Sequence, residues 1–289
     1  MPESIVTCMS VYMRFPGGRK KAFTMSYDDG VETDIRLIEI MRKNGLKGTF
    51  NINSGLFAPE GTVYPPEKFA RRMSRSAAYD TYVNSGMEIA CHGLTHAYLD
   101  QLPPELATYE VLRDRENLEE MFDRQIRGMA YAYGRFNDNA VETLKKCGIA
   151  YSRTVISTNS FDIPGDWHRL PATCHHNSDK LTALAKKFLE KSPTGDPWLF
   201  YLWGHSYEFE RDNNWALIEE FASYIGGQSD IWYCTNIELY DYIAAYRALK
   251  FSVNGKIVFN PTAMPVCFEM NMNKKIYTIS PGETVRISD

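Results

Sequence analysis

The sequence alternates short runs of β-branched and aromatic residues with segments of helical period, and this alternation continues along most of the chain. "KAFTMS" at residues 21–26 and "GTFNIN" at 48–53 are typical of strands, and "TDIRLIEIMRKNG" at 33–45 is typical of a helix between them. About seven or eight such units follow one another up to residue 250. Alternating strands and helices build a parallel sheet covered by helices. We therefore predict a distorted (β/α) barrel of the TIM type, with an open doubly wound sheet as the alternative.

The last part of the chain has a different pattern. Residues 251–289 show alternating residues, "NG" and "PG" turns and no helical period, which indicates short antiparallel strands. The segment is too short to be an independent module. We predict two parts: a barrel domain over residues 1–250 and a small β appendage over residues 251–289 that packs on it.

Composition and charge give no sign of a nucleic-acid or membrane partner. The formal net charge of −4, with mixed signs, gives no basic stripe for nucleic acid and no polybasic membrane anchor. The chain has no leader-like start and no stretch near ~18 consecutive apolar residues. Its 6 cysteines form no C-x-x-C pair, which indicates reduced thiols. We therefore expect a cytoplasmic protein without nucleic-acid or membrane partners, of undetermined oligomeric state.

Two adjacent carboxylates, Asp28 and Asp29 in "SYDDG", end the first strand-like run. Asp and Gly are turn residues, so a surface turn would explain this stretch alone. However, "HGLTH" places His92 and His96 directly after another strand-like run. Two histidines and one carboxylate suffice for a catalytic zinc or a similar metal, and either aspartate could supply the carboxylate.

Other polar residues follow later strand-like runs. "YAYGR", "DIPGDW" and "LWGH" bring Tyr133, Asp166 and His205 to such positions. Taken separately, a turn carboxylate and a loop histidine would explain Asp166 and His205. Together with the aspartates and histidines above, they all lie at the C-terminal ends of predicted strands, where barrel enzymes build their active sites. We therefore predict one site at that edge.

These five stretches, taken in order, resemble the polysaccharide deacetylases, which are carbohydrate esterase family four and carry the NodB homology domain. The resemblance covers roughly residues 20–250. It implies a metal-dependent hydrolase that removes acetyl groups from N-acetylated amino sugars or, less often, from acetylated xylan. It also implies a divalent metal, zinc foremost, with cobalt, nickel or manganese as alternatives.

The resemblance implies different roles for the two aspartates. Asp28 matches the catalytic base of the family, and Asp29 matches a metal ligand that acts together with His92 and His96. A metal in such a site polarises the substrate carbonyl and lowers the pKa of water, while the base accepts a proton. The positive charge of the metal also explains why two carboxylates can stand side by side.

The remaining motifs match the groups that stabilise charge and protonate the leaving group. The resemblance implies that the backbone N–H of Tyr133 contributes to an oxyanion hole. It assigns the general acid to His205 and the carboxylate that orients and charges this histidine to Asp166. A neighbouring carboxylate favours the imidazolium form that an acid requires.

The sequence departs from the family pattern at the arginine that pairs with the base. This arginine usually begins the third motif, where Ala130 or Tyr131 stands here. Arg135, Arg153 and Arg169 are the candidates to replace it. In addition, glycine replaces the usual Ser/Thr after the first histidine, and the last motif has W-G-H where L-x-H is expected, which indicates a divergent branch with its own substrate.

Aromatic and basic residues near these motifs are candidates for binding the sugar. Rings can stack on sugar rings, although burial in the core is the default for each of them. "TCHHNS" adds Cys174, His175 and His176 as a candidate second metal site. An ordinary loop explains this stretch better, because adjacent residues of an extended chain point in different directions. The rim of the substrate site is the remaining candidate place for these residues. The predicted substrate-binding residues are Trp203, Trp167, Tyr207 and Arg135.

The sequence thus predicts a deacetylase of acetylated saccharides, with N-acetyl amino sugars preferred over O-acetyl esters. One alternative is an allantoinase-like amidohydrolase that works without a metal, which the complete ligand set disfavours. A second is a sugar-binding protein without catalysis. A third is a two-histidine, one-carboxylate oxygenase, which a second aspartate and a remote histidine disfavour.

Overall fold

The computed structural model describes residues 11–271 and 273–287. Its main sheet is parallel throughout, in the order β7-β6-β5-β4-β3-β2-β9-β8, and β10 pairs with the first residues of β2. The strands are β2 (Lys21–Asp28), β3 (Thr49–Ile52), β4 (Glu88–Cys91), β5 (Gly128–Ala130), β6 (Tyr151–Ser157), β7 (Leu170–Ala172), β8 (Cys174–His175), β9 (Trp198–Gly204) and β10 (Ile231–Tyr233).

The main sheet curls until its two edges meet. β7 and β8 stand at opposite ends of the strand order, yet only Thr173 separates them in the chain. The backbone N–H of Thr173 donates to the carbonyl of Tyr201 in β9 at 2.8 Å. Edges joined by a single residue require a closed, bent sheet, so the predicted distorted (β/α) barrel is confirmed.

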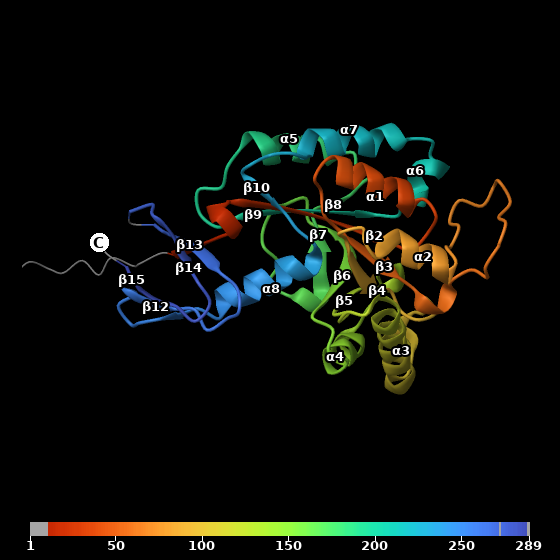
Figure 1. Cartoon of the computed structure of the whole chain (residues 1–289), viewed down its shortest axis with the longest axis horizontal. Helices are drawn as coiled ribbons and strands as arrows, with labels where there is room; N and C mark the ends of the chain where they lie inside the picture. Colours follow the sequence, from red (N-terminus) through yellow and green to blue (C-terminus); the bar gives the residue numbers. More distant parts are fainter. Residues whose placement is uncertain (1–10, 272, 288–289) are drawn as a thin grey trace, which may run out of the picture.

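Helices cover the outside of the barrel (Figure 1). In this view α1, α5 and α7 lie along one side, and α3 and α4 lie on the other. Several begin at a side-chain cap, as α8 does, where Thr235 and Glu238 form a reciprocal capping box. The helices are α1 (Asp34–Lys43), α2 (Arg75–Tyr82), α3 (Pro104–Phe122), α4 (Asp138–Lys146), α5 (Leu181–Glu190), α6 (Tyr207–Arg211), α7 (Trp215–Ile225) and α8 (Asn236–Arg247). Single 3₁₀ turns are η1 (Pro16–Gly18), η2 (Ser54–Leu56), η3 (Leu99–Gln101), η4 (Ala132–Gly134) and η5 (Trp167–Arg169).

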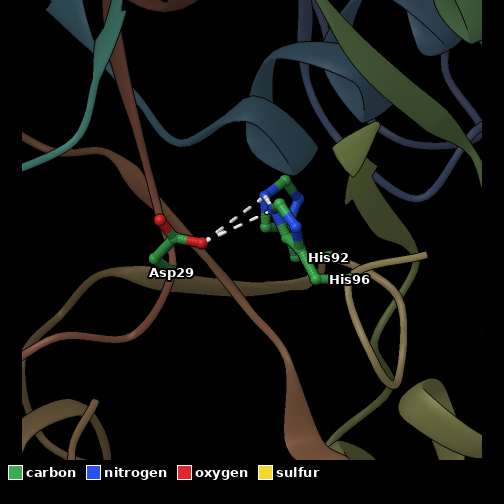
Figure 2. A group of neighbouring side chains, drawn as sticks. All are labelled: Asp29, His92 and His96. Atoms are coloured by element: carbon green, nitrogen blue, oxygen red, sulfur yellow. Dashed lines mark hydrogen bonds and ion pairs between the residues drawn. The ribbon is translucent and has the colours of Figure 1, made fainter. Parts of the chain in front are cut away.

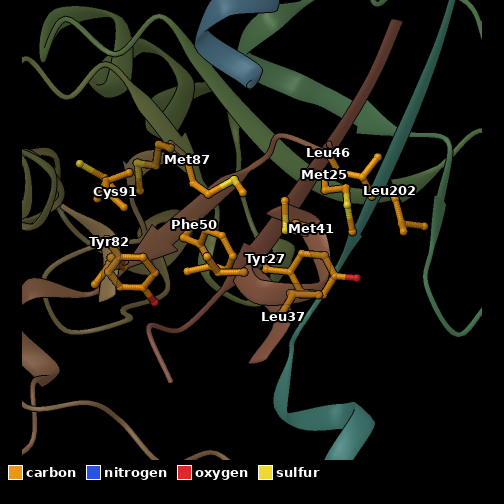
Figure 3. Packing of buried hydrophobic residues seen from close by; sticks show 14 of the residues in the cluster. Met25, Tyr27, Leu37, Met41, Leu46, Phe50, Tyr82, Met87, Cys91 and Leu202 are labelled. Carbon is orange, nitrogen blue, oxygen red and sulfur yellow. The ribbon is translucent and has the colours of Figure 1, made fainter. Parts of the chain in front are cut away.

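The hydrophobic core lies between the sheet and its helices. All eight residues of β2 are buried, because β3, β9 and β10 flank this strand. Met25 and Tyr27 of β2 pack beside Leu37 and Met41 of α1 and Phe50 of β3 (Figure 3). Truncating one such side chain to alanine typically costs about 2–5 kcal/mol, so this layer holds β2 rigidly in place. The site described below begins at the end of β2.

The C-terminal segment forms two small antiparallel sheets at one end of the molecule (Figure 1), which confirms the predicted antiparallel strands. One sheet has the order β1-β13-β14, and its β1 comes from the N-terminal part of the chain. A buried ion pair between Arg14 of β1 and Glu269 of β13, at 2.9 Å, supports this pairing. The strands are β1 (Val11–Arg14), β11 (Lys250–Phe251), β12 (Ile257–Phe259), β13 (Val266–Met270), β14 (Ile276–Ile279) and β15 (Thr284–Arg286).

Two segments differ from the sequence-based expectation. The stretch "PPEKFARRMSRSAAYDTYV" at residues 65–83 predicts one helix that begins at a proline, but only Arg75–Tyr82 is helical. Before this helix, the chain bonds to the turn that follows β2: the Met73 N–H donates to the Gly30 carbonyl at 3.1 Å. Residues 161–176 show no strand-like run in the sequence, yet they contain η5, β7 and β8.

The structure also bears on the expectations about membranes and thiols. Within residues 11–271 and 273–287, no helix is long and apolar enough to cross a membrane. The cysteines described in this range are free and buried. Cys8, also expected to be reduced, lies outside the described residues.

Candidate active site

The predicted site residues gather where neighbouring parallel strands end. β2 ends at Asp28, β4 ends one residue before His92, and β9 ends one residue before His205. β2 pairs with both β3 and β9, and β3 pairs with β4, so these ends share one edge of the barrel. The edge is the carboxyl end of the parallel strands, as predicted.

Asp29, His92 and His96 form one cluster (Figure 2). The Oδ1 atom of Asp29 lies 3.6 Å from His96 Nε2 and 3.9 Å from His92 Nε2. The two Nε2 atoms lie 3.1 Å apart. Figure 2 shows the Asp29 carboxylate pointing toward both imidazoles.

The surroundings of His92 determine which ring nitrogen faces this cluster. Its Nδ1 lies 2.8 Å from the carbonyl oxygen of Ala130, so Nδ1 carries the proton and donates to that oxygen. The lone pair of Nε2 is therefore free to face His96 and Asp29. The backbone N–H of His92 also donates to the buried Asp114 carboxylate at 3.0 Å, which holds the backbone in place.

These donor atoms fit a divalent cation. Ligands about 2.0–2.1 Å from a tetrahedral zinc lie roughly 3.3 Å from one another, close to the separations above. Burial and the neighbouring His92 lower the pKa of His96 to about 4, so this imidazole is neutral near pH 7, as a metal ligand must be. Two lone-pair nitrogens beside a carboxylate oxygen make a chemically suitable ligand set for zinc.

The backbone of Asp29 explains how two adjacent aspartates face different partners. Its φ of 89° lies in the left-handed region, which is unusual for a residue other than glycine and costs of order 1–3 kcal/mol. The turn directs Asp29 away from Asp28. Arg72 stabilises it: its Nη2 donates to Asp29 Oδ1 at 2.8 Å, and its Nη1 donates to Asn53 Oδ1 at 2.9 Å. Arg72 could not be recognised from the sequence, because it lies in a stretch with a helical pattern.

Asp28 is buried and bonded on both carboxylate oxygens. Asn51 Nδ2 donates to Oδ1 at 2.8 Å, and Arg153 Nη2 donates to Oδ2. Burial raises the pKa of Asp28, but the charge of the Arg153 guanidinium, with His92 and His205, outweighs it and lowers that pKa to about 2. The carboxylate is therefore ionised at neutral pH, as a base must be.

Of the three arginines considered as partners of the base, the structure brings Arg153 to Asp28. Arg153 has no exposed surface, and its guanidinium lies 4.5 Å from the centre of the Trp203 ring. Arg135 instead pairs with Asp100, and Arg169 pairs with Asp138 and Asp166. β5 and β6 are neighbours in the sheet, which places the arginine of β6 next to the motif that lacks one.

His205 stands on the other side of Asp28. Its Nε2 lies 3.9 Å from Asp28 Oδ2, and its Nδ1 lies 3.7 Å from Glu208 Oε2. The predicted partner, Asp166, is not brought there: its Oδ1 accepts from the His168 N–H at 3.0 Å and its Oδ2 from Arg169 at 2.6 Å. The predicted pairing of Asp166 with His205 is therefore corrected: the Asp166 carboxylate caps η5, and the carboxylate that lies beside His205 Nδ1 is that of Glu208.

The predicted aromatic residues divide into two groups. Trp203 lies between Arg153 and the ring of His175, and Tyr207 is 5.3 Å from His205 between ring centres, so both lie at the site. Trp167 is buried in the core against Tyr240, which corrects its assignment to substrate binding.

Tyr133 lies beside the metal-ligand cluster. Its ring centre is 4.3 Å from that of His96 and 4.2 Å from that of Tyr98. Its φ of 57° lies in the left-handed region, so the backbone turns sharply at this residue. Arg135, also predicted to bind substrate, is held by Asp100 and lies over the Tyr98 ring at 5.3 Å.

Glu208 and Asn51 are the residues that the sequence analysis missed on this side of the site. Glu208 stands three residues after His205 in "HSYE", a spacing that lets two side chains meet across one helical turn. That spacing was a usable signal. Asn51 carried no comparable signal, because a single asparagine in a strand-like run has many structural explanations.

Comparison with known proteins supports the resemblance. Residues 16–152 match the family model described as polysaccharide deacetylase. Among curated proteins, none matches the chain. The match to the family model confirms the predicted resemblance to polysaccharide deacetylases.

Two solved structures with TM-scores of 0.50 or more have a similar fold. A putative polysaccharide deacetylase from Mycobacterium smegmatis has a TM-score of 0.56 at 15% identity, over 82% of this chain and 94% of that one. A family 4 carbohydrate esterase from Streptomyces lividans, in complex with acetate, has a TM-score of 0.50 at 16% identity, over 74% and 92%. A Streptococcus pyogenes deacetylase in complex with acetate matches at 19% identity with a TM-score of 0.41, and the match spans 50% of this chain and 62% of that one.

Proposed function

We propose that this chain, whose residues 16–152 match the polysaccharide deacetylases, is a metal-dependent hydrolase that removes acetyl groups from an acetylated saccharide. N-acetyl amino sugars are the preferred substrates and O-acetyl esters the second. One observation carries the proposal: the two adjacent aspartates have different surroundings. Asp29 lies in a cluster with His92 and His96, and Asp28 is bonded to Arg153 and Asn51. His92 Nε2 lies 3.9 Å from both carboxylates and so stands between the two parts of the site.

Asp29, His92 and His96 are the residues that would hold the cation. When bound, a divalent metal such as zinc supplies Lewis acidity that polarises the acetyl carbonyl and makes water more acidic. Asp28 is ionised and immobilised by Arg153 and Asn51, so it is ready to accept the proton of the attacking water. The backbone N–H of Tyr133 is the expected donor to the oxyanion.

His205 is the general acid in this proposal. It lies within 3.9 Å of Asp28, which allows one substrate group to reach both residues. Burial lowers the pKa of His205, but Glu208 and the charges of Asp28 and Asp29 outweigh burial, and that pKa is raised above its ordinary value. A raised pKa keeps the imidazolium populated near neutral pH, where it can protonate the leaving amine or alkoxide.

The decisive experiment measures acetate release. The purified chain, depleted of metal and reconstituted with zinc, cobalt, nickel or manganese, is incubated with chitooligosaccharides and with acetylated xylooligosaccharides. We expect metal-dependent release of acetate, faster from the N-acetylated substrates. His205→Ala is expected to lower turnover by about 10²–10⁴ while metal content stays unchanged.

The alternatives give different outcomes. Hydrolysis of a ureide by the metal-free chain would favour the allantoinase-like function. Saccharide binding without acetate release under any metal would favour a sugar-binding protein. Loss of metal from His205→Ala would show that the acid is misassigned.

A further inference from the structure

A cluster of three imidazoles surrounds Glu208, and the proposed chemistry uses only one of them. We call His175, His176, His205 and Glu208 the Glu208 cluster. The Oε2 atom of Glu208 lies 3.1 Å from His175 Nε2 and 3.1 Å from His176 Nε2. It lies 3.7 Å from His205 Nδ1.

The fold builds this cluster from three elements. His175 of β8 stands opposite Trp203 of β9, and the His176 N–H donates to the Trp203 carbonyl at 2.9 Å. α6 begins two residues after His205, and the Glu208 N–H donates to the His205 carbonyl at 3.1 Å.

A glycine in β9 gives the cluster its room. A Cβ on Gly204 would lie 2.0 Å from His176 Nδ1, so the buried His176 ring can pack here only against a glycine. This accounts for the W-G-H form of the last motif.

The hydrogen bond made by His175 shows which of its nitrogens carries the proton. The backbone N–H of Asn177 donates to His175 Nδ1 at 3.1 Å, so Nδ1 is the acceptor and Nε2 carries the hydrogen. An N–H, and not a lone pair, therefore faces Glu208. His175, His205 and Glu208 lie close enough together for a cation, but a protonated Nε2 makes His175 a donor to the carboxylate and not a metal ligand.

The imidazoles around Glu208 favour its ionised form. Burial raises its pKa, but His175, His176 and His205 outweigh burial and hold that pKa far below its ordinary range. Its side chain is only 12% exposed, so solvent screens its charge weakly.

The position of this anion orients the acid. Glu208 faces Nδ1 of His205, while Nε2 of the same ring faces Asp28 and the end of β2. A proton on Nδ1 directed at the carboxylate leaves Nε2 as the nitrogen that serves the substrate. The other groups that face His205 are Asp28 and Asp29 from the end of β2, His175 from β8, Trp203 from β9 and Tyr207 from α6.

We propose that Glu208 is the positioning residue of the acid, that it holds His205 with Nε2 toward the substrate and in the imidazolium form, and that His175 and His176 fix the Glu208 carboxylate in turn. The role of His205 as a general acid rests on the proposed function. The geometry of the Glu208 cluster, and its effect on the titration of His205, are independent of that function.

The test is a histidine-selective NMR titration of the zinc-loaded chain, wild type and Glu208→Gln. The chain has 6 histidines, so each resonance can be assigned by single substitution. An opposite charge within about 4–6 Å shifts a pKa by about 1–3 units, so the pKa of His205 is expected to fall by about one to two units in Glu208→Gln. The zinc content should be unchanged.

The same substitution should also shift the pH dependence of kcat in a defined direction. Glu208 raises the pKa of His205, so the protonated acid persists to higher pH in the wild type than in the variant. Glu208→Gln should therefore move the alkaline limb of kcat to lower pH by the same amount and lower kcat more than it changes KM. Glu208→Asp, which keeps the charge, should recover part of the shift.

Glu210→Gln is the matched control. It removes a carboxylate from the same short helix, but Glu210 pairs with Arg71 at 2.8 Å. We expect no change in the titration of His205. If Glu208→Gln fails to fold, His175→Gln tests the same cluster and should lower the pKa of His205 by a smaller amount, because the carboxylate is kept but less firmly held.

Each remaining outcome decides one question. An unchanged His205 titration in Glu208→Gln, with normal acetate release by the wild type, overturns the positioning role and leaves the proposed function intact. A shifted titration in a chain that releases no acetate supports the positioning and defeats the proposed function. A second equivalent of zinc that disappears in Glu208→Gln overturns the inference, because the cluster is then a cation site.

Discussion

The two sides of Asp28 are built in different ways. On the metal side, Asp29 and His92 are held by backbone hydrogen bonds to the neighbouring strand: the Asp29 N–H donates to the Asn51 carbonyl and the His92 N–H to the Ile52 carbonyl. On the acid side, His205 meets Glu208 through side chains, and α6 and β8 supply the surrounding groups.

The pairing of β2 and β4 with β3 thus brings Asp29 and His92 to the same place, whereas the carboxylate beside His205 comes from a helix outside the sheet. An acid needs only a carboxylate near one ring nitrogen, and several elements can deliver one. Here Glu208 of α6 faces His205, while Asp166 serves as a cap in η5.

The largest effect is expected on the metal side. Asp29→Ala should lose the bound metal, and with it acetate release, because two neutral imidazoles alone make a weaker and incomplete site. Asp28→Asn is the matched variant: it keeps the shape but cannot accept a proton. It should retain the metal while turnover falls by about 10²–10⁴.

Elemental analysis beside acetate release distinguishes the two variants. Turnover of Asp28→Asn should recover in part at higher pH, where hydroxide can replace the missing base. If Asp28→Asn loses the metal and Asp29→Ala keeps it, the two aspartates have exchanged roles and the division between the two sides is wrong.

An intermediate effect is expected for the arginine that holds the base. Arg153→Met leaves a buried carboxylate without its cation, which typically costs about 3–5 kcal/mol of unfolding free energy. Burial raises the pKa of Asp28, and the Arg153 charge is the largest effect that lowers it, to about 2. Removal of this charge should therefore raise that pKa and move the acid limb of turnover to higher pH. Denaturant unfolding and a pH profile measure both effects.

Arg169→Met is the control for that variant. Arg169 is 35% exposed and pairs with carboxylates outside the site, so its loss should cost less than about 1 kcal/mol and leave the acid limb unmoved. Equal effects of the two substitutions on the pH profile would argue against a specific pairing of Arg153 with the base. Arg153→Lys, which keeps a positive charge, serves if Arg153→Met does not fold.

The smallest effect is expected for Asp166→Asn. Asparagine caps a helical turn as well as aspartate does, so only an exposed ion pair with Arg169 is lost, worth about 0–1 kcal/mol. Turnover should stay within about twofold and the alkaline limb should not move. A clear shift of the alkaline limb in Asp166→Asn would show that Asp166, as the family motif indicates, is the carboxylate partner of His205. It would contradict the contrast drawn between the two sides of Asp28.

Residue order was enough to favour a barrel over an open sheet and to place the candidate metal ligands at one edge, while the family resemblance distinguished Asp29 from Asp28. Strands and helices follow from local hydrophobic periodicity, and parallel strands bring their ends to one edge whatever the side chains are. Asp29, His92 and His96 each lie within a few residues of such an end. Their meeting was therefore predictable without knowledge of the packing, whereas β7 and β8, which are two or three residues long, left no periodic signal.

Tertiary structure decided which arginine holds the base and which carboxylate faces the acid. Arg153 lies 125 positions from Asp28 in the chain, and three arginines were equally plausible until the pairing of β5 with β6 brought one of them inside. Glu208 reaches His205 only because the chain turns into α6 directly after β9. Such contacts depend on where the charged groups at the ends of long side chains lie. The packing of the whole barrel determines these positions, and local sequence patterns do not contain them.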